Sequence, residues 1–230
     1  MKLQDKTTSL EQAVARIRDG ATVLVGGFGV PGTPFTLLQE LRRQGQKNLT
    51  LVKNDANETG MGVDHLLRSG QVRKLVVTHI GLNANAIALM NSGGIEVEFC
   101  AQGILAERIR AGGAGLPAFL TDIGIGTELA QGKRTVDLDG RSLLVETAIR
   151  ADAALIHAAS ADGFGNLTYA ATARNFNAAM AMAADVVIAE TETLAPLGSL
   201  APDAVHTPGV FVDHVVALPA LTEEYGVVRR

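Results

Sequence analysis

Residues 21–34 read Ala-Thr-Val-Leu-Val-Gly-Gly-Phe-Gly-Val-Pro-Gly-Thr-Pro, and this stretch decides the fold. An apolar run rich in β-branched residues ends in a glycine turn, and a segment with apolar residues at helical spacing follows. That order is typical of a parallel strand whose C-terminal end meets a phosphate or another anion. The sequence therefore predicts an α/β protein with a ligand loop after its first strand.

The composition indicates one α/β core and excludes several classes of partner. The 230 residues are 47% hydrophobic but only 4% aromatic, which fits buried parallel strands and packed helices in a single domain over residues 1–230. A net charge of −4 does not predict the basic surface that nucleic-acid-binding proteins use. A single Cys excludes a disulfide framework, and no apolar run approaches the roughly 18 residues that span a bilayer. We expect a cytoplasmic protein without a membrane partner, and the excess apolar content favours a large subunit interface.

Helical and strand patterns alternate with short links as far as residue 115. Ser9 caps the first helix, and Asp139-Gly140 is a strong turn pair for a hairpin of 134–139 with 141–145. Further strands are predicted at 22–25, 49–53, 74–78, 95–99, 154–157 and 185–189, with a short edge strand at 166–169, and helices at 34–43, 63–68, 85–90 and 101–110. This pattern predicts an open, mostly parallel sheet with flanking helices and a small β-rich C-terminal lobe.

The loop contains a literal G-x-G-x-x-G at Gly27, Gly29 and Gly32. Asp55, about 20 residues further on, is a candidate for the acidic residue that accepts a hydrogen bond from the ribose of a dinucleotide. An NAD(P)-dependent oxidoreductase is therefore one interpretation. The two prolines of the loop oppose it, because proline has no N–H to donate to a pyrophosphate. The spacing alone leaves a dinucleotide, a plain βα turn, and another acyl- or phosphate-bearing ligand open.

Five blocks of sequence together resemble the alpha subunit of family I coenzyme A transferases. They are Gly26-Gly-Phe-Gly-Val-Pro-Gly-Thr-Pro34, the long block from Val97 through Gln102-Gly-Ile-Leu-Ala-Glu-Arg-Ile-Arg-Ala-Gly-Gly-Ala-Gly to Phe119, Asp162-Gly-Phe-Gly-Asn-Leu167, Thr172-Ala-Arg-Asn-Phe-Asn177, and His206-Thr-Pro-Gly-Val-Phe-Val212. The resemblance implies an enzyme acting on short acyl groups such as acetate, butyrate and 3-oxoacids. It also implies that Gly26, Gly27, Phe28, Gly29, Val30, Pro31 and Gly32 contact coenzyme A, which is a substrate and not a permanently bound cofactor.

The reaction implied by the resemblance moves coenzyme A between two carboxylates through a glutamyl thioester. In the family that glutamate lies in the beta subunit, within Ser-Glu-Asn-Gly, and this sequence has no such tetrapeptide. We therefore expect a partner beta subunit, in an α₂β₂ or larger complex, with this chain as one half of the enzyme. The closest match is Asn57-Glu-Thr-Gly60, so Glu58 as a nucleophile of its own remains a second possibility beside a solvated loop carboxylate.

Three further residues take roles from the resemblance. Gln102 matches the glutamine whose amide supports the oxyanion, and the intact block around it favours this role over a local bond at a helix N-terminus. Asn54 and Asp55 fall in Lys53-Asn-Asp-Ala-Asn57, where the alpha pattern is Ser-Asn-Asn-Ala-Gly, and both are assigned to the substrate site. Because Asp55 offers only acceptors, we hypothesise selection of a cationic or hydroxyl-bearing acyl group.

The remaining polar candidates favour structural roles. Cys100 ends an apolar strand and is expected in the core, as is His157. The five histidines show no spacing typical of a metal site. The charged residues of 107–110 predict a solvated face or a structural ion pair, and the glycines of 111–115 a close backbone approach. A ligand-binding regulator built on the same fold is a further, non-enzymatic alternative.

Overall fold

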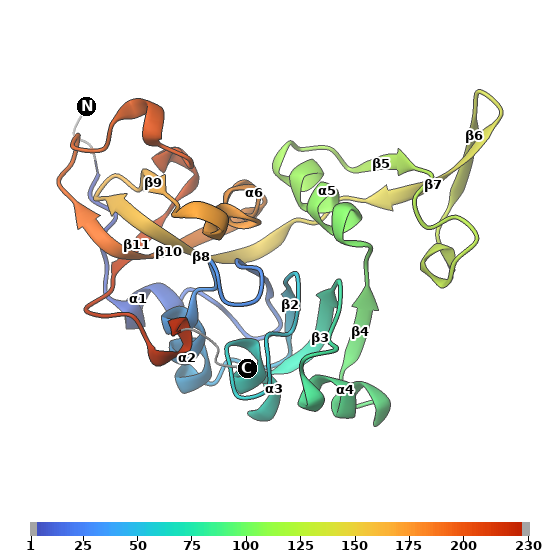
Figure 1. The fold of residues 1–230 in the computed structure, drawn as a ribbon, viewed down its shortest axis with the longest axis horizontal. Coiled ribbons are helices and arrows are strands. Elements are labelled where there is room, and N and C mark those ends of the chain that lie inside the picture. Colours follow the sequence, from blue (N-terminus) through green and yellow to red (C-terminus); the bar gives the residue numbers. More distant parts are fainter. Residues whose placement is uncertain (1–3, 227–230) are drawn as a thin grey trace.

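The computed structural model describes residues 4–226, whose centre is one large sheet (Figure 1). Seven parallel strands follow the order β11-β10-β8-β1-β2-β3-β4, and the short β9 pairs antiparallel with β8. They are β1 (Thr22–Val25), β2 (Leu49–Val52), β3 (Val72–Val77), β4 (Glu96–Phe99), β8 (Ala151–Asp162), β9 (Leu167–Thr168), β10 (Ala184–Ala195) and β11 (His214–Ala217). The chain fills one side from β1 to β4 and the other from β8 to β11, so the strand order reverses beside β1, where open sheets bind ligands.

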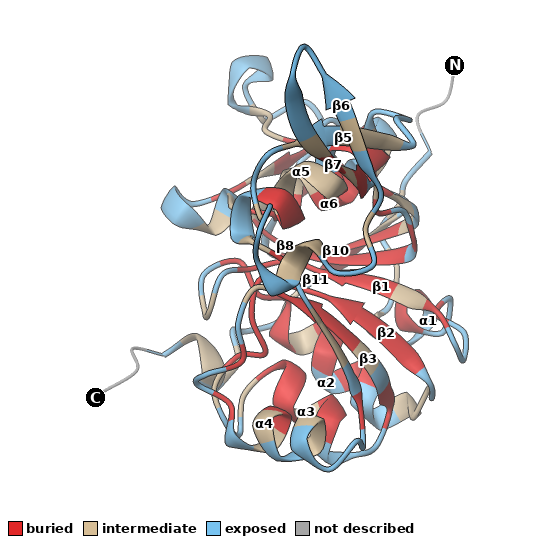
Figure 2. Cartoon of the chain, turned by 90° about the vertical axis from the view of Figure 1, so that its right-hand side faces the viewer, coloured by how far each residue is buried: buried red, intermediate tan, exposed pale blue. Residues whose placement is uncertain are grey.

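Helices cover both faces of this sheet. They are α1 (Leu10–Val14), α2 (Phe35–Gln44), α3 (Val63–Arg68), α4 (Ala84–Asn91), α5 (Gln102–Gly113) and α6 (Asn177–Met182). Val23 and Val25 of β1 enter the core beneath α1–α4, while Leu24 enters the core beneath α5 and α6. The strands of the sheet are therefore mostly buried (Figure 2), and the open mostly parallel sheet is confirmed.

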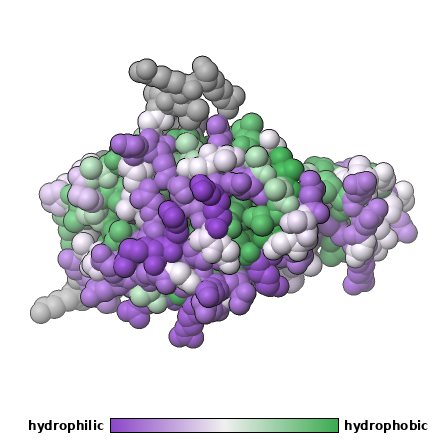
Figure 3. Space-filling model, turned by 90° about the horizontal axis from the view of Figure 1, so that it is seen from below, coloured by the Kyte–Doolittle hydropathy of each residue, from purple (hydrophilic) through white to green (hydrophobic). Residues whose placement is uncertain are grey.

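The outer surfaces are polar over the helices that cover one face. Seen from below, the side that carries α2, α3 and α4 is mainly hydrophilic (Figure 3), because the apolar sides of these helices pack inward. Within residues 4–226, no helix combines the length and the apolar character needed to cross a bilayer.

A three-stranded antiparallel sheet projects from the body (Figure 1). It contains β5 (Ala118–Thr121), β6 (Thr135–Leu138) and β7 (Arg141–Thr147), in the order β5-β7-β6. The predicted hairpin is confirmed, with positive φ at both Asp139 and Gly140. The small β-rich lobe is therefore present, but it is inserted in the middle of the chain. The C-terminal strands instead extend the main sheet.

Other element bounds differ from the predictions for local reasons. Strand β1 and helix α3 have the predicted bounds, whereas α5 continues past Arg110 as far as Gly113. Its glycines are needed for packing, since a Cβ on Gly112 would lie 1.9 Å from the Ile149 carbonyl oxygen. The close backbone approach predicted for this glycine run is thus confirmed at Gly112. Strands β8 and β10 are each 12 residues long, much longer than their predicted apolar centres.

Candidate active site

The glycine loop, residues 26–34, follows β1 where the strand order reverses, and close packing fixes its shape. Gly32 has φ of +76°, and a Cβ there would lie 2.4 Å from the Ala173 carbonyl oxygen. A Cβ on Gly26 would lie 1.9 Å from the Asn177 side-chain oxygen. Both positions therefore require glycine, because any larger residue would collide with backbone or with a buried amide.

The segment 172–177 holds the glycine loop from one side. Asn177 Nδ2 donates to the Gly32 carbonyl oxygen at 3.0 Å, and Asn175 Nδ2 donates to the Pro31 carbonyl oxygen at 2.9 Å. Two side-chain amides thus fix two carbonyl groups of the loop. This contact gives a physical reason why the sequence block at 172–177 accompanies the glycine block.

A buried carboxylate of the chain itself occupies the N-terminus of α2, directly after the loop. The Leu37 N–H donates to Glu190 Oε2 at 2.9 Å, and Glu190 is fully buried. His157 Nδ1 lies 2.9 Å from Glu190 Oε1, and the Tyr225 hydroxyl donates to the same oxygen at 2.7 Å. Burial alone would lower the pKa of His157, but hydrogen bonds and negative charge from Glu190 and Glu192 outweigh it and raise that pKa.

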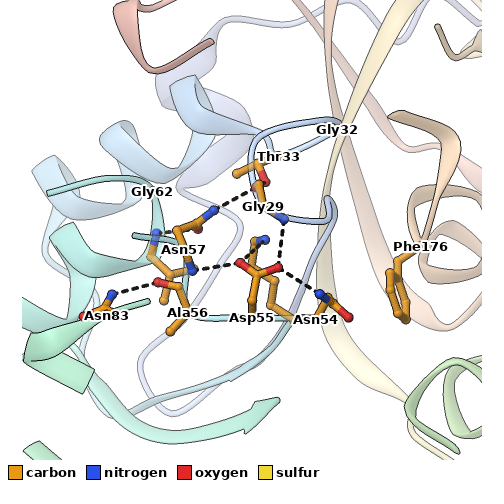
Figure 4. Close-up of polar contacts among 12 residues, drawn as sticks. Gly29, Gly32, Thr33, Asn54, Asp55, Ala56, Asn57, Gly62, Asn83 and Phe176 are labelled. Atoms are coloured by element: carbon orange, nitrogen blue, oxygen red, sulfur yellow. Dashed lines mark hydrogen bonds and ion pairs between the residues drawn. The ribbon is translucent and has the colours of Figure 1, made fainter. Parts of the chain in front are cut away.

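Asp55 ties the loop after β2 to the glycine loop (Figure 4). Its Oδ2 accepts from the Gly29 N–H at 2.8 Å and from Asn54 Nδ2 at 3.0 Å. Its Oδ1 accepts from the Asn57 N–H at 2.8 Å and from Lys53 Nζ at 3.2 Å. These four bonds match the acceptor capacity of an ionised carboxylate.

The Lys53–Asp55 pair keeps this carboxylate charged. Burial alone would raise the pKa of Asp55, but the charge of Lys53 and the hydrogen-bond donors lower it overall. Lys53 is itself fully buried, and burial lowers its pKa despite the neighbouring carboxylate. The pairing was missed from the sequence, because both residues lie in the loop after β2, where no regular spacing predicts which side chains meet. Asn57, in place of the family's glycine, has φ of +55°, a conformation that asparagine tolerates.

Asn54 links Asp55 to Gln102. Gln102 is the first residue of α5, and its Nε2 donates to Asn54 Oδ1 at 2.8 Å. Asn54 is fully buried, whereas Gln102 is exposed at the edge of the sheet. The Thr78 hydroxyl donates to the Asn54 carbonyl oxygen at 2.8 Å and fixes the backbone there. The predicted residues Asn54, Asp55 and Gln102 therefore form one continuous hydrogen-bonded row.

A pocket of about 290 Å³, which we call the loop pocket, lies between the glycine loop and the loop after β2. The larger side chains of its apolar wall are those of Phe28, Val30, Pro31, Met61, Ile80 and Leu82. Its polar side chains come from Asp55, Asn57, Glu58 and His79. None of the described residues that line it is Lys or Arg. The pocket is thus an apolar space with acidic groups at one side.

Several N–H groups of the glycine loop already donate within the chain. The donors are Gly26 to Leu155, Phe28 to Pro31, Gly29 to Asp55, and Thr33 to Val30. We therefore expect the loop to meet a ligand mainly through side chains such as Phe28, which is 47% exposed, and less through backbone donors.

The other sequence candidates have structural surroundings. Cys100 is buried, as expected, and burial raises the pKa of its thiol. Arg108 lies 3.1 Å from that sulfur and pairs with Glu98 at 2.7 Å, while Glu107 and Arg110 form an exposed ion pair. Within the described part of the chain, no three metal-ligating side chains are placed to hold an ion.

The dinucleotide interpretation is not favoured by this geometry. It needs a free helix N-terminus for the pyrophosphate, but Glu190 already occupies that of α2. It also needs an acidic side chain for the ribose, but Asp55 is engaged by four donors.

Comparison with known proteins decides the family. Residues 7–218 match the family described as Coenzyme A transferase. The chain belongs to this family. The alpha subunit of acetate CoA-transferase from Escherichia coli K12 is 44% identical over 214 residues, 93% of this chain and 97% of the relative. The alpha-type (A) subunit of succinyl-CoA:3-ketoacid coenzyme A transferase from Xanthomonas campestris pv. campestris (strain B100) is 46% identical over 216 residues, 93% of this chain and 89% of the relative. This chain is therefore an alpha-type subunit of a CoA-transferase.

Solved structures share the CoA-transferase fold of this chain. An acyl-CoA transferase from E. coli O157:H7, in a thioester complex with CoA, has a TM-score of 0.85 at 25% identity; the match covers 97% of this chain and 49% of that one. This chain thus corresponds to about half of that protein. A variant of the decarboxylase AibA/AibB has a TM-score of 0.81 at 30% identity, covering 95% of this chain and 84% of that one. Since a decarboxylase has the same fold, the fold alone does not fix the reaction.

Proposed function

We propose that this chain is the alpha subunit of a heteromeric enzyme that transfers coenzyme A between a short-chain acyl-CoA and a free carboxylate. The acyl groups belong to the fatty-acid and 3-oxoacid class, in line with the acetate and 3-ketoacid names of the relatives. The nucleophile is a glutamate of a partner beta subunit. The complex is cytoplasmic and is α₂β₂ or larger.

The observation that carries this proposal is the placement of Gln102. Its amide has two N–H groups, and one of them is used by the buried Asn54. The other can donate to a carbonyl oxygen that becomes negatively charged during acyl transfer. A neutral donor held in place before the reaction is the kind of group that stabilises such an oxyanion.

The partner supplies the covalent chemistry. Its glutamate attacks the acyl-CoA carbonyl, forming an acyl–glutamyl anhydride and releasing the CoA thiolate. The thiolate then attacks the glutamyl carbonyl, giving the glutamyl-CoA thioester and the free carboxylate of the donor. The acceptor carboxylate repeats these two steps in reverse. Gln102 would stabilise the oxyanion in these steps, and the loop pocket would hold the acyl chain.

The test is to locate the covalent intermediate. The chain is mixed with an acyl-CoA and its beta subunit, and both proteins are examined by intact mass spectrometry and peptide mapping. We expect the added mass of CoA on a glutamate of the partner. Glu58 of this chain lines the loop pocket and is the alternative position.

A matched variant separates the two positions. Glu58→Gln retains the size of the side chain but removes a carboxylate nucleophile. We expect Glu58→Gln to form the partner's adduct as the wild type does. An adduct on Glu58, lost in this variant, would contradict the assignment of the nucleophile to the partner.

A further inference from the structure

The last described segment of the chain returns from the edge of the sheet to the candidate active site. Strand β11 ends at Ala217 on the outer edge of the main sheet. Residues 222–226, with one turn of 3₁₀ helix at Glu223–Tyr225, lie beside α2, which follows the central strand β1 (Figure 1). We call residues 222–226 the latch. The match to the family ends at residue 218, so membership of the family does not imply the latch.

Tyr225 connects the latch to the glycine loop. Its hydroxyl lies within hydrogen-bond distance of the Thr33 carbonyl oxygen and of Glu190 Oε1, and its single proton can be donated to either. Its ring packs edge-to-face on Phe35, with 4.8 Å between the ring centroids. Thr33 Oγ1 donates in turn to the Gly29 carbonyl oxygen at 2.6 Å, and Gly29 lines the loop pocket. Tyr225 therefore contacts the residue that fixes this part of the loop.

Glu224 connects the latch to the loop after β2. Its Oε2 accepts from the Gly62 N–H at 2.6 Å, directly after Met61 of the pocket lining. Gly62 has φ of +51°, and a Cβ there would lie 2.4 Å from Asn57 Oδ1. The backbone at Gly62 is thus packed against Asn57, which also lines the pocket. The other carboxylate oxygen, Oε1, accepts from the exposed Gln39 of α2, a bond that contacts neither loop.

The two loops meet at one carbonyl group. The Gly29 carbonyl oxygen accepts from Thr33 Oγ1 and also from Asn57 Nδ2, at 2.9 Å. One donor comes from the residue that Tyr225 contacts, and the other from the residue that packs against the Gly62 backbone. Both connections of the latch therefore lead to Gly29. Neither Glu224 nor Tyr225 is among the described residues that line the loop pocket, so each can act on a ligand only through other residues.

We propose that Glu224 and Tyr225 are positioning residues, and that the latch holds the glycine loop and the loop after β2 in the arrangement that binds the acyl substrate. This inference rests on the proposed function, in which the loop pocket holds the acyl chain. A pocket with loosened walls binds the substrate and the transition state more weakly by the same amount. Loss of a latch contact then raises KM and leaves kcat nearly unchanged.

Two neighbouring glutamates of the latch provide a matched pair of variants. The reconstituted complex is given saturating acetyl-CoA, and kcat and KM are measured for butyrate as the acceptor. Glu224→Ala should raise KM about fivefold, the effect expected for loss of one hydrogen bond, with little change in kcat. Glu223→Ala removes the same charge from an exposed position and should keep the wild-type KM. Equal KM values in the two variants would overturn the inference.

Conservative variants test whether the hydrogen bonds carry the effect. Glu224→Gln loses the charge but retains a side-chain oxygen that can accept from the Gly62 N–H, so it should restore a KM close to that of the wild type. Tyr225→Phe keeps the ring that packs on Phe35 and loses the hydroxyl, so it should raise KM as Glu224→Ala does. A Glu224→Gln complex as impaired as Glu224→Ala would contradict positioning through this bond.

Hydrogen exchange tests the latch without any turnover. Peptides that cover residues 26–34 and 57–63 should exchange about threefold faster or more in Glu224→Ala than in Glu223→Ala, because both loops open more often. Peptides from β8 should exchange at the wild-type rate, which shows that the variant is folded. Unchanged exchange in both loops would overturn the inference. Faster exchange in both loops, in a complex whose wild type transfers no CoA, would support the latch and refute the proposed function alone.

Discussion

At the residue scale, the site depends on buried groups that position an exposed one. Asp55 orients Asn54, and Asn54 in turn holds the amide of Gln102. A long side chain that is free to rotate loses conformational entropy whenever it must adopt the one orientation that a reaction requires. Because the hydrogen bond to Asn54 already orients Gln102 in the folded chain, this loss of entropy occurs when the chain folds and does not add to the barrier of the proposed reaction. The same carboxylate holds the glycine loop through Gly29, so one buried group aligns both sides of the site.

Loss of the Gln102 donor should slow catalysis and leave assembly intact. In the reconstituted complex, Gln102→Ala is expected to lower kcat by about 10²-fold, the usual effect of removing one oxyanion donor. Gln102→Glu keeps the size but replaces the N–H donors with acceptors, so it should be similarly slow. Gln39→Ala, at an exposed position on α2, is the control. A near-normal kcat for Gln102→Ala would remove this residue from the mechanism.

The sequence named residues for a candidate site but not the bonds that join them. Resemblance placed Asn54, Asp55 and Gln102 at the site, yet nothing in the sequence showed that Asn54 is buried between the other two. The contact of Asn54 with Gln102 joins residues 48 positions apart and depends on β2, β3 and β4 lying side by side. The Lys53–Asp55 pair is close in sequence, but it lies in the loop after β2, where strand alternation does not apply.

At the element scale, one buried cluster joins α2, β8 and β10 to the end of the described chain. Glu190 of β10 caps α2, and His157 of β8 lies between Glu190 and Glu192. The Tyr225 hydroxyl lies within hydrogen-bond distance of both Glu190 and the Thr33 carbonyl oxygen, and its single proton can be donated to either. The side chains of the cluster come from positions up to 68 residues apart, and the contact of Tyr225 with the Thr33 backbone spans 192 residues, so no local pattern could have predicted the cluster. By contrast, β1 follows from a local apolar run rich in β-branched residues.

The cluster predicts a pH-dependent stability. The pKa of His157 is raised in the folded chain, so protonated His157 stabilises the fold fully below the unfolded pKa of about 6.5. As the pH rises through the folded pKa, above that value, this contribution is lost. We expect the free energy of unfolding of the wild type to exceed that of His157→Gln most at about pH 5.5, with the difference shrinking toward about pH 8.5.

Urea unfolding at a series of pH values measures this difference. His79→Gln, at an exposed position, serves as the control for loss of a histidine elsewhere. A difference between the wild type and His157→Gln that grows as the pH rises would contradict the stabilising role of the protonated ring.

At the scale of the whole molecule, the projecting lobe exposes apolar side chains. The exposed residues there and in the adjoining segment include Leu116, Leu120, Ile123, Ile125 and Leu138. Figure 2 shows most of this lobe as exposed. Exposed apolar residues gathered on one projection are typical of a surface that another subunit covers. They also agree with the high apolar content of the sequence, which by itself gave no position for an interface.

The last prediction concerns assembly. If the nucleophile belongs to a partner, this 24.0 kDa chain alone should show no CoA transfer, and activity should appear on mixing with the beta subunit. Light scattering should show a mass consistent with two copies of each subunit or more. The Gln102→Ala chain should assemble equally well but remain slow, which separates assembly from catalysis.

Full activity of the isolated chain would place the nucleophile here, with Glu58 the first candidate. An assembled complex that binds acyl-CoA without transferring it would instead favour a ligand-binding regulator.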